Sequence, residues 1–247
     1  HVHTARALGR VTLHADAGLI ADPWINNLDE RAALRPITAS ASETYLFGAT
    51  GELGVAGAAT IGPARLLVAF GNGEGRNFGE RNNGKNTTAL LDATFALGQL
   101  HDVPMLLWLA AMARDGSLGP AAARNHRFGT AATFTTGIGA LGLEAVRGLG
   151  VAGRGDVTAT SGAAWVQASI LPRLAIAGRF AQARFAVDNT ESTGRTQSVM
   201  AAVSTTLLSA RAGTSGSRDA AATCNAAGLR AWLSAERRTA TGIASSL

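Results

Sequence analysis

The sequence holds one cysteine, Cys224, among its 247 residues. A single cysteine excludes an internal disulfide and any metal site built from cysteine ligands. The five histidines lack the spacing of a zinc-binding helix motif, and we interpret the pair at His1 and His3 as incidental. The sequence therefore predicts neither a metal nor a cofactor.

Aromatic and charged side chains are also scarce, at 5% and 16% of the chain, whereas 47% of the residues are hydrophobic. The longest uninterrupted apolar run is Val103–Ala113, far short of the ~20 residues that a membrane-spanning helix needs. Such a chain is either a globular domain or a protein whose apolar residues are spread over β-strands, as in an outer-membrane barrel. It starts at His1 without a methionine or a signal peptide, which is typical of a mature or truncated product.

The stretch GATGELG, residues 48–54, is similar to the phosphate-binding turn of nucleotide-dependent oxidoreductases. That turn must be followed by a helix, but only VAGAAT precedes Ile61-Gly62-Pro63. The dehydrogenases with this turn also use a tyrosine and a lysine four residues apart, whereas Tyr45 and Lys85 are the only residues of these types. We therefore interpret GATGELG as a β-turn between two strands. Since no catalytic serine or cysteine motif is found elsewhere, the sequence predicts that the protein is not an enzyme.

Alternation of apolar and polar residues is the dominant pattern of the chain. In RLAIAGRF, residues 173–180, one predicted face carries Leu174, Ile176 and Phe180 and the other carries Arg173 and Arg179. The same period predicts about a dozen strands, which lie at 5–16, 44–49, 52–60, 64–71, 87–97, 103–114, 127–137, 138–147, 156–169, 173–180, 196–208 and 229–236.

The connections between these strands are of two kinds. Some are tight, such as Thr136-Gly137 and Leu171-Pro172, and others are long and polar, such as 21–43 and 72–86. Short turns at one end and long loops at the other are typical of a bacterial outer-membrane barrel. The predicted fold class is all-β, an antiparallel transmembrane β-barrel that forms a single domain over residues 1–247.

Arginine supplies 21 of the 22 basic residues, and the formal net charge is +5. Arginines on the polar faces of barrel strands would line a water-filled path and attract anions, to which the guanidinium offers a forked donor. Each of them could instead be a solvated surface residue. The candidate pore-lining or anion-binding residues are Arg6, Arg10, Arg127, Arg173, Arg179 and Arg230.

Residues 64–88 carry a strand that ends in Asn72-Gly73-Glu74-Gly75, a loop with NNGK at 82–85, and a second strand. This segment resembles the phosphate-selective porin-like family of bacterial outer-membrane β-barrels. DAGLIADPW at 16–24, GALGLEAVRGLG at 139–150 and residues 164–180 are also similar to segments of that family, so that the resemblance covers about residues 10–210.

The resemblance implies a β-barrel channel for anionic solutes that assembles as a homotrimer and has basic residues at a constriction. Family barrels are longer, so this chain would lack N-terminal strands. The phosphate-binding lysines of the family have no counterpart here except Lys85. We therefore expect a general porin for small anionic or polar solutes in the bacterial outer membrane, in contact with membrane lipid and without a nucleic-acid partner. The alternatives are a structural outer-membrane barrel without a transport role and a soluble β-rich protein.

Overall fold

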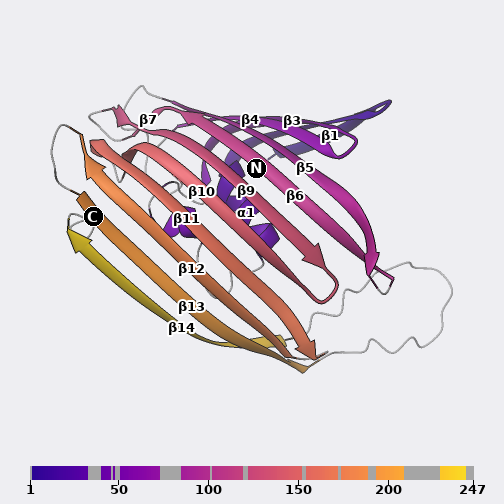
Figure 1. Cartoon of the computed structure of the whole chain (residues 1–247). Helices are drawn as coiled ribbons and strands as arrows, with labels where there is room; N and C mark the ends of the chain where they lie inside the picture. Colours follow the sequence, from indigo (N-terminus) through magenta and orange to yellow (C-terminus); the bar gives the residue numbers. More distant parts are fainter. Residues whose placement is uncertain are drawn as a thin grey trace.

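In the computed structural model, one antiparallel sheet of twelve strands curves around a short helical segment (Figure 1). The residues that the structure describes are 2–32, 40–45, 47, 51–72, 85–100, 102–118, 122–151, 154–171, 174–188, 193–208 and 229–242. The strand order is β1-β2-β3-β4-β5-β6-β9-β10-β11-β12-β13-β14, and β7 and β8 form a separate two-stranded sheet. Each strand of the large sheet thus pairs with its neighbours in the chain, apart from the excursion through β7 and β8.

The strands of the large sheet are β1 (Val2–Leu8), β2 (Val11–Ala21), β3 (Gly51–Ile61), β4 (Ala64–Gly71), β5 (Asn86–Leu100), β6 (Val103–Asp115), β9 (His126–Thr136), β10 (Gly139–Val151), β11 (Arg154–Leu171), β12 (Leu174–Val187), β13 (Thr193–Leu208) and β14 (Leu229–Gly242). The short strands are β7 (Ser117–Leu118) and β8 (Ala123–Arg124), and the helices are α1 (Pro23–Ala32) and α2 (Ala41–Thr44). The seven predicted strands between residues 52 and 169 are confirmed, with small differences at their ends.

The prediction of one strand over residues 5–16 is wrong, because the chain turns back within it. Leu8 of β1 pairs directly with Val11 of β2, and Gly9, between them, has a φ of 62°. Positive φ costs glycine nothing, and a two-residue turn of this kind suits a tight hairpin. Gly62, with a φ of 56°, makes the same kind of turn between β3 and β4.

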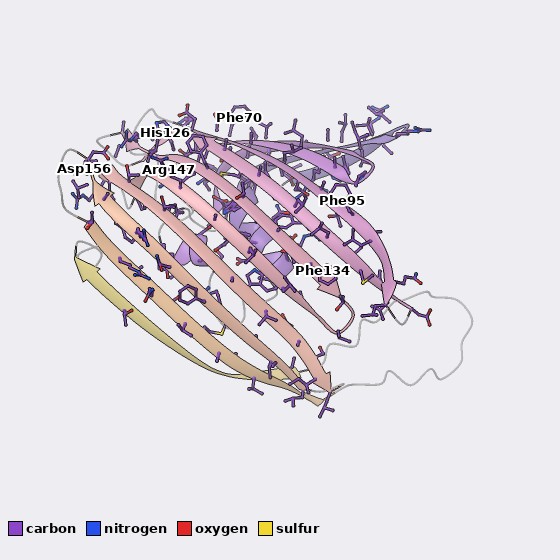
Figure 2. All side chains as sticks on the ribbon, viewed as in Figure 1. Phe70, Phe95, His126, Phe134, Arg147 and Asp156 are labelled. Carbon is purple, nitrogen blue, oxygen red and sulfur yellow. The ribbon has the colours of Figure 1, made fainter. Side chains whose placement is uncertain are left out.

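The two faces of the sheet differ sharply in composition. Directly paired residues of antiparallel strands point to the same face, so the register traces the convex face across the sheet. It carries exposed apolar side chains from nearly every strand, among them Leu66, Phe70, Leu91, Leu109, Phe128, Leu143, Val166, Phe180 and Val199. Figure 2 shows these side chains projecting from the strands, with Phe70, Phe95 and Phe134 labelled.

The remaining residues of each strand, which alternate with the exposed ones, lie on the concave face, and most of them are buried. On β12, Ala175, Ala177 and Arg179 are buried, whereas Ile176 and Phe180 are exposed. The predicted division of residues 174–180 into two faces is confirmed. The alternation predicted over 196–203 is confirmed in the same way, with Ser198 and Met200 buried and Val199 exposed.

Residues 21–43, predicted to be a long polar loop, contain both helices, which lie against the concave face (Figure 1). The predicted strand at 44–49 is wrong at its start, because α2 ends at Thr44 and Tyr45 caps it, whereas residues 46, 48 and 49 lie outside the described residues. For GATGELG, residues 48–50 lie outside the described residues, and β3 begins at Gly51. The second half of the motif, Gly51–Gly54, is therefore strand and not the predicted turn, and α2 is the last element before it in the described residues.

Within the described part of the chain, neither helix is long and apolar enough to cross a membrane.

Candidate functional site

The concave face is occupied by a segment that enters after β2 and leaves before β3. We call its described residues, 22–32, 40–45 and 47, the inserted segment. Trp24, Ile25 and Leu28 of α1 pack in one buried cluster with Trp108 of β6 and Leu90 of β5. The wall of β11 and β12 contributes small residues to this cluster, which are Ala159, Ala163, Ala181 and Ala183. The inserted segment therefore fits into a concave face whose side chains leave space for it.

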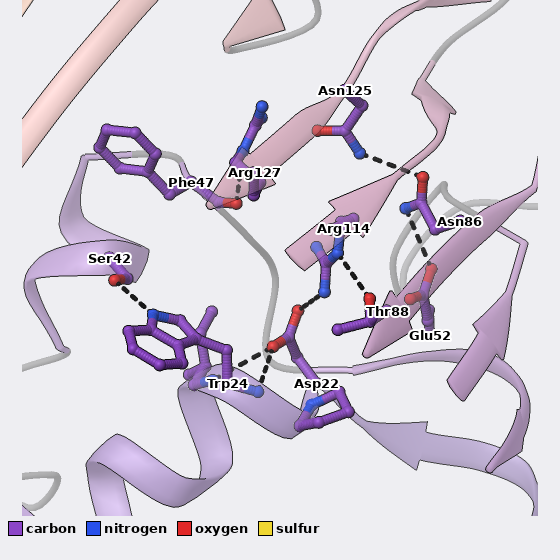
Figure 3. Close-up of polar contacts among 12 residues, drawn as sticks. Asp22, Trp24, Ser42, Phe47, Glu52, Asn86, Thr88, Arg114, Asn125 and Arg127 are labelled. Carbon is purple, nitrogen blue, oxygen red and sulfur yellow. Dashed lines mark hydrogen bonds and ion pairs between the residues drawn. The ribbon is translucent and has the colours of Figure 1, made fainter. Parts of the chain in front are cut away.

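The first end of the inserted segment is fixed by Asp22. One carboxylate oxygen accepts hydrogen bonds from the backbone N–H of Trp24 (2.9 Å) and of Ile25 (3.1 Å), and Pro23 occupies the first helical position. Both features are typical of a helix start. The other oxygen forms an ion pair with Arg114 of β6, and Arg114 also donates to Thr88 Oγ1 at 2.8 Å (Figure 3). All of these side chains are buried.

The last end of the inserted segment is fixed by Arg127 of β9. Its Nε donates to the backbone carbonyl of Phe47 at 2.8 Å (Figure 3). Its Nη1 donates to the carbonyl of Gly150 at 2.5 Å. The guanidinium also lies 5.9 Å from the centre of the Phe47 ring, a cation–π arrangement. Tyr45 contacts a strand near the other edge of the sheet, because its hydroxyl donates to Ser198 Oγ of β13 at 3.4 Å.

The two helices are joined by Trp24, whose indole N–H donates to Ser42 Oγ at 3.0 Å (Figure 3). The Trp24 ring lies against Gly129 of β9 so closely that a Cβ at this position would come within 2.9 Å of the ring. Gly129 is therefore required for the ring to approach the backbone of the strand. A side chain here would displace α1.

A second polar group holds the outer part of α1. Arg65 of β4 forms an ion pair with Asp92 of β5 at 2.8 Å and donates to Asn27 Oδ1 at 2.6 Å. Asp92 also accepts from the Trp108 indole at 3.3 Å. The Arg31 guanidinium in turn lies 5.3 Å from the centre of the Trp108 ring. Side chains of three consecutive strands thus hold α1 by charge as well as by packing.

Further polar residues line the concave face on the other side of the inserted segment. Glu144 of β10 is buried and interacts electrostatically with Arg179 of β12. Arg179 pairs in register with Trp165 of β11, which is also buried. These residues place a carboxyl group and a guanidinium group inside the curve of the sheet.

Ion pairs also occur at the exposed rim of the sheet. Arg124 pairs with Asp188 at 2.6 Å, and Thr158 donates to the same carboxylate at 3.0 Å. The hydrogen bond from Arg124, followed by that from Thr158, lowers the pKa of Asp188 below its ordinary value of 3.8. Arg154 and Asp156 form a second exposed pair at 2.9 Å.

The six predicted pore-lining arginines fall into distinct places. Arg127 and Arg179 lie buried on the concave face. Arg6 is exposed and shares the convex face with its register partner Leu13, and Arg10 is exposed in the turn after Gly9. Of the four whose side chains the structure describes, two thus lie on the face where a lumen would lie, and one of these, Arg127, holds Phe47. Arg173 lies outside the described residues, and of Arg230 the structure gives the register partner, Thr206, but no side chain.

Sequence reasoning missed Asp22 and Arg114. The Asp22-Pro23 pair followed by Trp24, Ile25 and Leu28 is a helix-start signal with apolar residues at helical spacing, and it could have been found. Arg114 carries no such signal, because its partner is 92 residues away in the sequence. Within the described residues, no group of three or more His, Cys, Asp or Glu side chains is arranged to hold a metal ion.

No protein-family model matches the sequence, and no curated protein does. Among solved structures, the chain is similar to OccAB3 of Acinetobacter baumannii, with a TM-score of 0.50 and 9% sequence identity. The likeness covers 96% of this chain and 61% of that protein, so the chain spans less than two thirds of the length of OccAB3. At this identity the likeness shows the fold alone. It confirms the predicted fold class, an antiparallel outer-membrane-type β-barrel, and the coarse porin-like part of the resemblance.

Proposed function

We propose that the protein is an outer-membrane channel of the porin type, which lets small hydrophilic solutes diffuse across the membrane. The observation that carries the proposal is the contrast between the two faces of the sheet. The convex face exposes large apolar residues from β1 to β13, such as Phe128 (52% exposed) and Leu143 (57%). Water would disfavour a surface of this kind, whereas the hydrocarbon of a bilayer suits it.

The polar residues of the concave face support the channel part of the proposal. Thr88, Asp92, Arg127, Glu144 and Arg179 all lie on this face. Charged side chains at membrane depth are typical of a solute path and are costly elsewhere. In this proposal the inserted segment narrows the path.

A preference for anions is the finer part of the proposal. Arg114, Arg127 and Arg179 are buried, so they act on a passing solute through their electric field rather than by direct contact. Asp22 offsets part of that field. We therefore expect a modest preference for anions. Phosphate selectivity and a homotrimeric assembly stay predictions.

A second candidate function is a structural outer-membrane barrel without an open path. The observation that favours it is the dense packing of the inserted segment, since Trp24, Ile25 and Trp108 are each no more than 2% exposed. Because that packing closes part of the concave face, the structural role is a real competitor to the channel.

The experiment that separates the two candidates is single-channel recording in a planar bilayer with the whole chain refolded in detergent. A KCl gradient then gives the ion selectivity from the reversal potential. Conductance with a reversal potential on the anion side supports the proposal, and Arg179→Gln is expected to move that potential toward zero. Arg154→Gln removes the same charge from the exposed rim and serves as the matched control. A correctly refolded protein that never conducts would leave the structural role.

A further inference from the structure

Three arginines lie in one row across the convex face. Arg147 of β10 pairs in register with Thr160 of β11, Thr160 pairs with Arg184 of β12, and Arg184 pairs with Arg195 of β13. Because direct partners share a face, all four side chains point outward, and all four are exposed. We call these four residues the arginine row. Figure 2 shows Arg147 near the same end of the sheet as His126 and Asp156.

The spacing of the arginine row matches a small polyanion. Arg184 and Arg195 are direct neighbours, with Cα atoms about 5 Å apart, and Arg147 is two strands away from Arg184, at about 10 Å. Like charges directly opposite each other are destabilising. An anion held between them would offset the repulsion, and forked guanidinium donors match phosphate oxygens.

The neighbouring charges leave the row basic. Asp156 and Asp188 lie nearer the rim and form ion pairs with Arg154 and Arg124. Neither Arg147 nor Arg184 forms an ion pair with a residue that the structure describes. Arg195 donates to the side-chain oxygen of Gln182 at 2.5 Å, and this bond holds its guanidinium over the row.

Below the arginine row the surface turns apolar within a few residues. One groove along β11 and β12 is lined by Gly162, Ala164, Phe180 and Arg184. A second groove, lined by Thr158, Thr160, Arg184 and Arg195, adjoins it. Arg184 lines both grooves, so the polar groove and the apolar groove meet at its side chain. A ligand with an anionic head and an acyl chain would fit both.

We propose that the arginine row binds the phosphate of a membrane lipid, whose acyl chain lies in the groove over Ala164 and Phe180. The proposal rests on the proposed function, since it requires the convex face to contact a bilayer. The row lies at the end of the sheet that carries the long connections after β2, β4 and β6.

The test compares lipid binding by the wild-type chain and by the double variant Arg184→Gln/Arg195→Gln, refolded in detergent. Native mass spectrometry counts the bound lipids during titration with phosphatidylglycerol and, separately, with phosphatidylcholine. We expect the variant to bind phosphatidylglycerol at least about tenfold more weakly, because it loses two charge-assisted contacts. Binding of phosphatidylcholine is expected to stay unchanged.

The matched control is Arg6→Gln/Arg10→Gln, which removes two exposed charges from β1 and the turn after it, away from the arginine row. Equal binding of phosphatidylglycerol by the row variant and the wild type would overturn the proposal. So would an equal loss in the control, which would show an effect of net charge alone. Inorganic phosphate is the third probe, and displacement of the lipid by millimolar phosphate would identify a site for the free ion instead.

Failure of the proposed function gives a different result. Each variant is also inserted into a planar bilayer, where conductance tests the channel. A chain that conducts but binds no phosphatidylglycerol contradicts only the lipid site, whereas a chain that binds the lipid without conducting contradicts only the channel.

Discussion

Arg114 of β6 and Arg127 of β9 are directly paired residues, and each holds one end of the inserted segment. Two like charges in this position would repel each other. The Asp22 carboxylate compensates Arg114, and the carbonyls of Phe47 and Gly150 accept from Arg127. The inserted segment therefore offsets much of the repulsion between the two arginines. The two arginines in turn hold both ends of the inserted segment at one place on the sheet.

Arg114→Gln is expected to destabilise the protein by about 3–5 kcal/mol, because it leaves the Asp22 carboxylate buried without its partner. Asp22→Asn in the same chain removes the charge while keeping a good helix-capping group, so the double variant should recover part of the loss. Urea unfolding in detergent micelles measures both. Strictly additive effects of the two changes would contradict a direct interaction.

Gly129→Ala is expected to cost about 1–3 kcal/mol, since the new Cβ would lie within 2.9 Å of the buried Trp24 ring. The same displacement should shift the tryptophan fluorescence to longer wavelength. Gly57→Ala is the control, because a Cβ there would be 3.8 Å from its nearest neighbour. If the two variants unfold at the same urea concentration, Trp24 does not depend on Gly129.

Leu143→Arg tests whether the convex face contacts lipid. Leu143 lies midway between the arginine row and the turn at Ile138, and an arginine at the bilayer midplane costs about 2–4 kcal/mol. Ile138→Arg, at the exposed turn, should cost no more than about 1 kcal/mol. Unfolding from lipid vesicles gives both values. If the two variants lose the same free energy of unfolding, Leu143 does not lie deeper in a bilayer than Ile138.

Asp188 gives the pH dependence of the rim. Its pKa is lowered in the folded protein, so the ion pair with Arg124 contributes stability above the ordinary value of 3.8. That contribution is lost as the pH falls through the lowered pKa. NMR titration of the carboxyl carbon measures the pKa, and Arg124→Gln is expected to move it back toward 3.8. An Asp188 pKa that is the same in both proteins would mean that Arg124 does not cause the shift.

Much of the sheet could be predicted from the sequence because alternation is a local property. On β12, each residue from Ala175 to Phe180 lies on the face that the alternation predicts, with Arg179 on one face and Ile176 and Phe180 on the other. The hairpin at Gly9 was missed because apolar and polar residues continue to alternate across the turn, so that the period alone does not reveal a reversal of the chain.

The candidate site was harder to predict, because it is built from contacts between distant residues. Arg127 was expected to face a solute, but in the structure it binds the carbonyl of Phe47, 80 residues away. Polarity identifies which side chains point inward. It does not identify which of them are taken up by the chain's own inserted segment.

The alanines of the β11 and β12 wall carry a consequence for engineering. Ala159, Ala163, Ala181 and Ala183 provide the space that the inserted segment fills. Replacing that segment by a short linker would leave only these small side chains at the four positions to take its place. In the proposed channel the inserted segment therefore sets the width together with the strands, so that redesigning residues 22–32 and 40–45 could adjust the width while the sheet stays intact.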